Sequence, residues 1–183
     1  MAELTLMGFA RALSEGVIIM EGTRHRDMTA ACKALQRASV KMIGHYQTGS
    51  SQFASWRALM PQTQFIRDQQ GYTKNDPLWR SGELRVHILY DVSADGSQGA
   101  VGVPDAIVGD GSPGNAVRNI GEIALDLEMG TTHGKGHIPP RSFLGLAASR
   151  GGKELAIYLG GRAASALFSR GGTRLHVPDI KDF

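Results

Sequence analysis

The sequence has few of the residues that cross-link a chain or anchor it in a membrane. Among its 183 residues there is one cysteine, Cys32, so no disulfide can form within the chain. No stretch reaches the roughly 18 consecutive apolar residues that a membrane-spanning helix needs. The first residues, "MAELTLMGFARAL", lack the basic start, the apolar run and the small-residue cleavage site of a signal peptide. We therefore expect a protein that contacts no membrane and is assembled in a reducing cytoplasm.

Aromatic residues are also scarce, whereas glycine is frequent. Aromatic residues make up 7% of the chain, and there are 24 glycines. This composition predicts a modest core with long connections. A small core is often stabilised further by neighbouring subunits. We interpret residues 1–183 as a single domain of ordinary size, and we expect it to form oligomers.

The net charge is only +3, but its distribution along the chain is uneven. Residues 91–130 carry a block of acids opposed by Arg118 alone: Asp91, Asp95, Asp105, Asp110, Glu122, Asp126 and Glu128. Residues 139–176 carry a block of bases opposed by Glu154 alone: Arg141, Arg150, Lys153, Arg162, Arg170 and Arg174. Two such blocks suit charge-complementary packing between copies, although ordinary solvated faces are an alternative. A dedicated DNA-binding protein would instead be basic along one face.

The first half of the chain predicts one clear helix followed by a long loop. Apolar residues recur at steps of three and four over residues 23–47, which indicates an amphipathic helix. Residues 4–20 suggest a strand or turn leading into a short helix. Residues 47–77 are polar and weakly periodic, so we expect a long excursion with one helical turn near 63–68, anchored by Trp56 and Leu59.

The second half predicts short strands and two helices. Residues 81–94 alternate between apolar and polar after a turn at Ser81 and Gly82, which favours a strand. Residues 99–111 have strand character interrupted by Pro104, and 119–131 fit a helix or a strand, with a short helix favoured. After Pro140 the chain is mostly helical, with a break expected at the glycines of 151–152. We predict an α+β fold, with long N-terminal and C-terminal helices packed on a small, mainly antiparallel sheet, and with long flexible loops.

Several motif-like stretches do not support chemistry. His133 and His137 flank Gly-Lys-Gly, but glycine disfavours the helix that would place them on one face, and no cysteine or acid is near. "GDGSPG" (109–114) matches a dinucleotide fingerprint formally, but it contains Pro113 and lacks a following long helix. Cys32 is interpreted as a small apolar filler of the first helix. The residues thus predict no catalytic, cofactor or metal site.

Four stretches taken in order resemble one family, the phage virion morphogenesis or tail-completion proteins of the head–tail neck. They are "WRALMPQT" (56–63), "LWRSGELRVHI" (78–88), "LEMGT" (127–131) and "IPPRSFLG" (138–145). The resemblance covers about 23–168, taken as the domain core, and leaves 171–183 as a C-terminal extension. Ser142 replaces a proline that is usual in the family. The motif residues that we carry over are Trp56, Gly82, Leu84, Arg85, Glu128, Gly130, Thr131, Pro139, Pro140, Arg141, Phe143 and Leu144.

The Pro-Pro-Arg stretch has a physical interpretation of its own. Pro139 and Pro140 lack backbone N–H donors and hold the chain extended. We expect Ser142 to cap the following helix, or Pro140 to lie in its first turn. Phe143 and Leu144 would be buried and hold the corner in place. Arg141 would bind the carboxylate of Glu128 or an acid of a partner.

The resemblance implies a structural virion protein without enzymatic activity and without cofactors. Copies of the chain would form a ring, six being the expected number, between the head connector or adaptor proteins and the tail tube, with the sheath as a further candidate partner. Genome DNA would pass through the lumen without specific binding, past acids of 91–128. Loops 47–77 and 130–137 would make the contacts. The alternatives are a tail-tube terminator, a head-side stopper, or, in another class, a nucleotide- or DNA-binding accessory enzyme.

Overall fold

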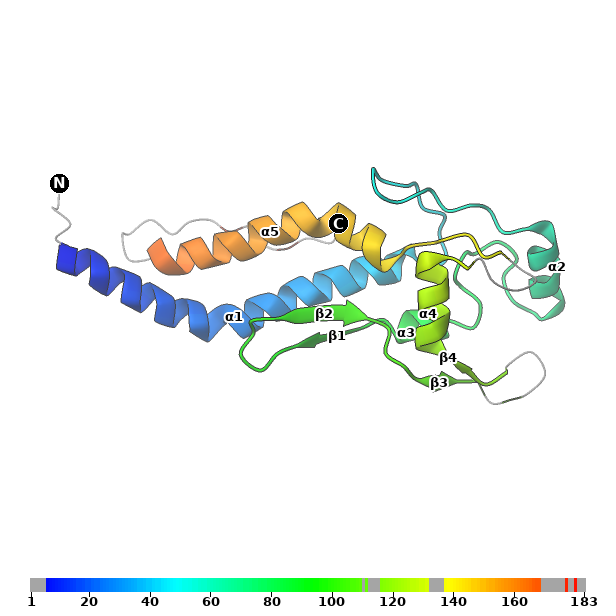
Figure 1. Ribbon diagram of the computed structural model, residues 1–183, viewed down its shortest axis with the longest axis horizontal. Helices are drawn as coiled ribbons and strands as arrows, with labels where there is room; N and C mark the ends of the chain where they lie inside the picture. The colour runs from blue at the N-terminus through cyan, green and yellow to red at the C-terminus, as the bar shows by residue number, and fades with distance from the viewer. Residues whose placement is uncertain are drawn as a thin grey trace. The chain divides into compact units, whose positions relative to one another are not determined.

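The computed structural model describes residues 6–109, 111, 116–131, 137–168, 177 and 180 (Figure 1). For residues 6–13, 16, 167 and 168 it describes the backbone alone. Helices account for 51% of the structure, and the α+β class is confirmed. The chain divides into two compact units. The first comprises Met1–Ala34, Asp91–Ala100 and Gly151–Phe183, and the second comprises Leu35–Tyr90 and Val101–Arg150. The interpretation as one domain stays a prediction beside this division.

The first helix, α1, is longer than its amphipathic stretch indicates. It runs without interruption over Leu6–Met42, so the strand or turn expected within 4–20 is wrong. No proline lies before position 61, and the segment is rich in Ala, Leu, Met and Glu, which favour helix. The helix ends at Met42 because Gly44 adopts a left-handed conformation (φ 95°) and donates its N–H to Pro77 O at 2.8 Å.

The first unit is held by small side chains and by one buried ion pair. Ala31, Cys32 and Ala34 of α1 are buried. Asp27, also buried, accepts a hydrogen bond from Arg162 Nε at 3.1 Å. The turn after β1 packs closely on α1, since a Cβ on Gly96 would lie within 2.5 Å of His25 N and His25 Cα. Glycine is therefore required at position 96, where the turn contacts the backbone of α1.

The second unit contains the larger core. Its most deeply buried large side chains are Phe143, Ile88 and Leu146. Trp56 and Leu59 are buried as well, as expected for the anchors of the long 47–77 segment. Within that segment α2 spans Pro61–Gln69, with proline at its first turn, so the expected helical turn is confirmed and extended.

The alternating stretch at 81–94 is mostly not a strand. It forms a helical turn, α3 (Glu83–Val86), and only then the strand β1 (Leu89–Val92). Leu84 and Ile88 are buried, whereas Val86 is 69% exposed. The buried residues are thus four apart, which is a helical spacing, and the two-residue alternation was misleading. Gly82 takes the left-handed conformation (φ 87°) that starts the turn.

The strands are short and form two separate pairs. β1 pairs with β2 (Gly99–Gly102), and β3 (Ile107–Val108) pairs antiparallel with β4 (Arg118–Asn119). The interruption expected at Pro104 is confirmed. Helix α4 (Ile120–Met129) follows β4 directly, because the Asn119 side chain accepts hydrogen bonds from Gly121 N and Glu122 N. The helix favoured for 119–131 is therefore confirmed.

The last helix, α5, is continuous over Leu144–Phe168, so the break expected at 151–152 is wrong. Gly151 is buried and Gly152 is exposed, and the helix tolerates both because glycine costs only about 1 kcal/mol relative to alanine within a helix. Of the C-terminal extension the structure describes residues 177 and 180 only. None of the described helices is long and apolar enough to cross a membrane.

Candidate functional site

The carboxylate of Glu128 caps the N-terminus of α5. It accepts hydrogen bonds from Phe143 N at 2.8 Å, Leu144 N at 3.1 Å and Gly145 N at 2.8 Å. It also accepts one from Ser142 Oγ. The first N–H groups of a helix have no partner within the helix, and the helix dipole favours a negative charge there. Glu128 therefore fixes the end of α4 to the start of α5.

The expected pairing of Arg141 with Glu128 is wrong. Among the described residues Arg141 forms no ion pair, and its Nη2 donates instead to Arg57 O at 3.1 Å. Ser142 does cap α5 as expected, since its Oγ accepts from Leu146 N at 3.2 Å. Pro140 lies before the helix, which begins at Leu144, so the alternative placement in the first turn is not adopted.

The Gly-Thr corner closes the loop that precedes the prolines. Gly130 has φ 75° and ψ 164°, a region accessible essentially to glycine alone. A Cβ there would lie 2.8 Å from Ile138 O and from Pro140 N. Thr131 N donates to Ile138 O at 2.9 Å in an isolated antiparallel bridge. The intervening residues 132–136, which include His133, lie outside the described residues.

The other motif residues are also packed against this corner or near it. Trp56 is buried and donates its Nε1 to Ser142 O at 3.2 Å, which links the long 47–77 segment to the start of α5. Phe143 is 0% exposed, and Leu144 and Pro139 are half-buried. Arg85 is exposed and lies over the ring of Trp79, with 5.0 Å to the centroid. Most of the residues carried over from the resemblance thus build one packed corner, whereas Gly82, Leu84 and Arg85 belong to the α3 turn.

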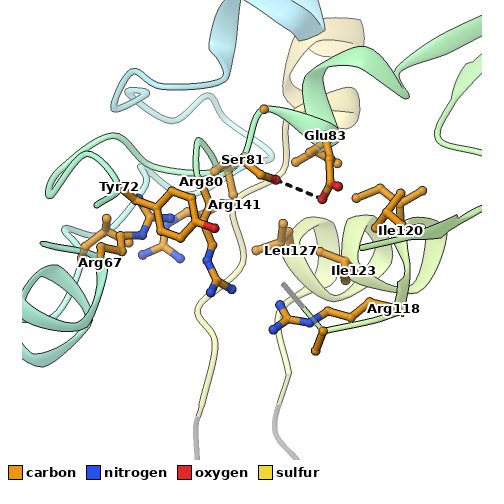
Figure 2. A pocket seen from close by; sticks show the side chains of 16 residues that line it. Arg67, Tyr72, Arg80, Ser81, Glu83, Arg118, Ile120, Ile123, Leu127 and Arg141 are labelled. Atoms are coloured by element: carbon orange, nitrogen blue, oxygen red, sulfur yellow. Dashed lines mark hydrogen bonds between the residues drawn. The ribbon is translucent and has the colours of Figure 1, made fainter. Parts of the chain in front are cut away.

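Beside this corner the second unit has a pocket of about 190 Å³ with a basic lining. Four arginines line it: Arg67, Arg80, Arg118 and Arg141. Among the described residues of the lining, Glu83 is the only acid, and Ser81 Oγ donates to its Oε2 at 3.0 Å. Figure 2 shows Arg67, Arg80 and Arg141 gathered near Tyr72, and Arg118 on the other side, near Ile123. The rest of the lining is largely apolar and includes Leu59, Leu78, Leu84, Ile120, Ile123 and Leu127.

Arg67 and Arg80, like Arg141, donate hydrogen bonds to protein oxygens. Arg67 Nη1 donates to Asp76 O at 2.6 Å and to Trp79 O at 3.1 Å. Arg80 Nη2 donates to Gln70 Oε1 at 2.8 Å, and its guanidinium lies 5.1 Å from the centroid of the Tyr72 ring. These contacts hold the two side chains in place.

Arg141 differs from these two because its Nε is buried and has no hydrogen-bond partner. The residue is only 5% exposed. Burial lowers the pKa of Arg141, and it also lowers the pKa of Arg67. The charges of Arg80 and Arg141 lower the pKa of Arg67 further, and the opposing effects of Tyr46 and Asp76 are smaller. The pocket therefore concentrates positive charge, and one of its buried guanidinium nitrogens, Arg141 Nε, has no hydrogen-bond partner.

Reasoning from the sequence missed this pocket. Of its arginines only Arg141 belongs to a motif, and the other three come from α2, from the loop before α3 and from β4. No spacing in the sequence connects these positions. A weak signal was present in Arg118, the one base within the acidic block of 91–130.

Two further groups have altered ionisation, both in the first unit. Hydrogen bonds from Ser93 Oγ, Ser97 N and Ser97 Oγ hold the pKa of the Asp95 carboxyl well below its usual range, and the charge of Arg24 adds to the effect. Burial, and to a smaller extent Asp91, raises the pKa of the Cys32 thiol. Within the described part of the chain, no three His, Cys, Asp or Glu side chains are grouped so that they could hold a metal ion.

No family model, no curated protein and no solved structure matches this chain.

Proposed function

We propose that this chain is a structural virion protein of the tailed-phage neck. Copies of it form a ring that completes the tail and joins it to the head connector. The proposal starts from the order of the four family-like stretches. It is supported by what their residues do, since Glu128, Trp56 and Phe143 cap, anchor and fill one corner of the second unit. A rigid corner of this kind suits a building block that must hold its shape among neighbours.

The observation that carries the proposal is the amount of apolar surface left uncovered. Val17, Ile18 and Ile19 of α1 are 43%, 67% and 47% exposed. Consecutive residues of a helix point about 100° apart, so a single core could not bury all three. Exposed apolar groups of this kind mark surfaces for protein–protein contact.

The second unit leaves apolar surface exposed as well. Leu125 and Met129 of α4 are 63% and 71% exposed, and residues four apart lie on the same face of a helix. Phe65 and Ile66 on α2 are also exposed. We place the contact between neighbouring copies on these faces. It is a heterologous contact that closes into a ring by rotation, with six copies expected.

Exposed acids provide the proposed polar part of these surfaces. Asp91, Asp105, Glu122 and Asp126 are exposed and suit either contact with bases of a neighbouring copy or a lumen that repels DNA phosphates. Glu128 is excluded from this role because its carboxylate caps α5. Asp95 is exposed too, but it is bound by Ser93 and Ser97.

The test is the size of the purified protein with and without tail tubes. We expect a monomer in solution and a ring on the tube by sedimentation and electron microscopy. The double substitution Leu125→Glu and Met129→Glu should leave the fold intact and abolish the ring, whereas Val86→Glu, at an exposed position outside the faces assigned to the contact, should not. Absence of the protein from mature particles would refute the proposal.

A second test addresses the loop before the prolines. Deletion of 130–136 should leave the chain folded but stop heads from joining tails, because we assign this loop to contacts between neighbours. Assembly of intact virions with the deletion variant would contradict that assignment. The choice between tail completion, a terminator and a stopper depends on which neighbour the ring binds in such a reconstitution.

A further inference from the structure

The basic pocket of the second unit has more charge than the proposed scaffold role requires. Its lining brings four guanidinium groups together with the single carboxylate of Glu83. Like charges repel at short range, and a cleft with low-dielectric walls strengthens the field inside it. Such a cluster is stable when an anion lies among its members.

Arg141 is the first group open to a ligand, because its buried Nε has no hydrogen-bond partner. A buried donor without a partner is rare in folded proteins, because it gives up its hydrogen bonds with water and gains none in return. Its Nη2 has a backbone acceptor, whereas the Nε has no acceptor at all. Nε and a terminal nitrogen of one guanidinium form the edge that binds two oxygens of a carboxylate or phosphate at once. In Arg141, the Nε of this edge thus lacks a hydrogen-bond acceptor.

Arg118 is the second group open to a ligand. It is exposed at the start of α4, directly before the Asn119 cap, and among the described residues no acid pairs with it. Figure 2 shows it across the pocket from the other three arginines. An oxyanion between Arg118 and Arg141 would therefore be held from two sides, while Arg67 and Arg80 add charge from fixed positions.

We propose that this pocket binds one compact oxyanion, a carboxylate or phosphate group, with Arg141 and Arg118 as its direct ligands. The cavity of about 190 Å³ suits a group of a few heavy atoms. It is smaller than the roughly 300–1,000 Å³ of pockets for drug-sized ligands, so a whole nucleotide is not the expected occupant. The apolar wall, which includes Ile123 and Leu127, accommodates carbon atoms next to the anionic group.

An oxyanion that fits this pocket can come from two sources. The oxyanion is either free in solution or the acidic side chain of a second copy of this chain, and the latter source rests on the proposed ring. An anion from solution would instead lock the corner between α4 and α5 in each subunit. The ligand chemistry is the same in both cases, and the experiment separates the sources.

The experiment measures thermal unfolding of the full chain during titration with inorganic phosphate and, separately, acetate. Chloride keeps the ionic strength constant. We expect a saturable rise in unfolding temperature and a dissociation constant that Arg118→Gln raises at least tenfold. Arg141→Lys, which keeps the charge but loses the two-nitrogen edge, should weaken binding as well. Lys153→Gln removes an exposed charge outside the pocket lining and should bind like the unsubstituted protein.

Sedimentation velocity on the same samples identifies the source. If the anion is free, the mass does not change with phosphate, and the dissociation constant is independent of protein concentration. If the source is a second copy, phosphate disperses oligomers in a saturable way and Arg118→Gln disperses them without phosphate. Either result supports the oxyanion site. A chain absent from virions that still binds phosphate would refute the neck assignment alone.

The proposal is overturned if neither phosphate nor acetate changes the unfolding temperature or the mass in a saturable way. It is also overturned if Arg118→Gln and Lys153→Gln both respond like the unsubstituted chain, because the effect would then come from general screening.

Discussion

Removal of the Glu128 carboxylate should weaken the second unit more than any other single loss of charge on α4. In Glu128→Ala, the N–H groups of Phe143, Leu144 and Gly145 and the hydroxyl of Ser142 all lose their acceptor. Water can reach part of the vacated space because Glu128 is half-buried, so the donors are only partly compensated.

The expected magnitude follows from the number and kind of these hydrogen bonds. Loss of an N-terminal helix cap costs about 0.5–2 kcal/mol. A hydrogen bond to a charged group contributes about 1.5–3 kcal/mol, and such values do not add fully within one cluster. We therefore expect Glu128→Ala to lower the free energy of unfolding by about 3 kcal/mol. Glu128→Gln keeps one carbonyl acceptor but loses the charge, and should lower it by about 1.5 kcal/mol.

Urea unfolding monitored by tryptophan fluorescence suits this test. Both tryptophans, Trp56 and Trp79, belong to the second unit, and Trp56 is hydrogen-bonded to Ser142 beside the cap. With a slope of about 2 kcal/mol per M urea, a loss of 3 kcal/mol moves the midpoint by about 1.5 M. Circular dichroism would show in parallel whether the first turn of α5 frays.

Asp126→Asn is the matched control. Asp126 lies on the same helix and is exposed, so its substitution should change the unfolding free energy by no more than about 0.5 kcal/mol. If Glu128→Ala and Asp126→Asn have the same midpoint, the cap does not stabilise the corner and our reasoning about α5 is wrong.

Three further substitutions test other parts of the structure. Gly130→Ala should destabilise the second unit by about 3 kcal/mol, because it combines backbone strain with Cβ contacts of 2.8 Å; the urea midpoint measures it. Arg162→Ala should destabilise the first unit by about 2 kcal/mol, because it leaves the buried Asp27 carboxylate with Arg26, a more distant partner. The partial exposure of Arg162 keeps this loss below that of a fully buried ion pair, and unfolding followed by circular dichroism measures it. Ser93→Ala should raise the pKa of Asp95 toward its usual value, as seen by carboxyl NMR. Since the folded pKa is depressed, this carboxylate contributes stability above the unfolded pKa near 3.9, and the contribution is lost as the pH falls further toward the folded pKa.

Each of these predictions has a control or a contrary outcome. Gly71→Ala also places alanine at positive φ (74°) but meets nothing within 4 Å, so it should cost only about 1–2 kcal/mol; equal losses at the two glycines would exclude a role for the Cβ contacts. A double-mutant cycle of Arg162→Ala with Asp27→Asn should show coupling, and strict additivity would contradict the ion pair. An unchanged titration of Asp95 in Ser93→Ala would show that the hydroxyl does not hold its charge.

Local signals in the sequence were sufficient for several elements. Asn119 marks the start of α4, Pro61 marks the start of α2, and Pro104 separates β2 from β3. Each works through groups within a few residues, by capping free N–H groups or by removing a donor. The α+β class followed from the predicted order of helices and strands along the chain.

Other features depend on contacts between residues far apart in the chain. The alternation at 81–94 fits a strand until packing shows that Leu84 and Ile88 are the buried pair. The glycines of 151–152 predict a break, but α5 continues through both positions. Propensity is a weak preference, and at 81–94 tertiary packing outweighs it.

The basic pocket and the Glu128 cap illustrate the same limit for the candidate site. Residue types alone made Arg141 and Glu128 a natural ion pair, because opposite charges attract. Only the folded backbone brings the free N–H groups of α5 to Glu128 and leaves Arg141 among three other arginines. Which partner a charge binds depends on the geometry of the assembled chain, whereas the start of a helix is often decided by its nearest neighbours in sequence.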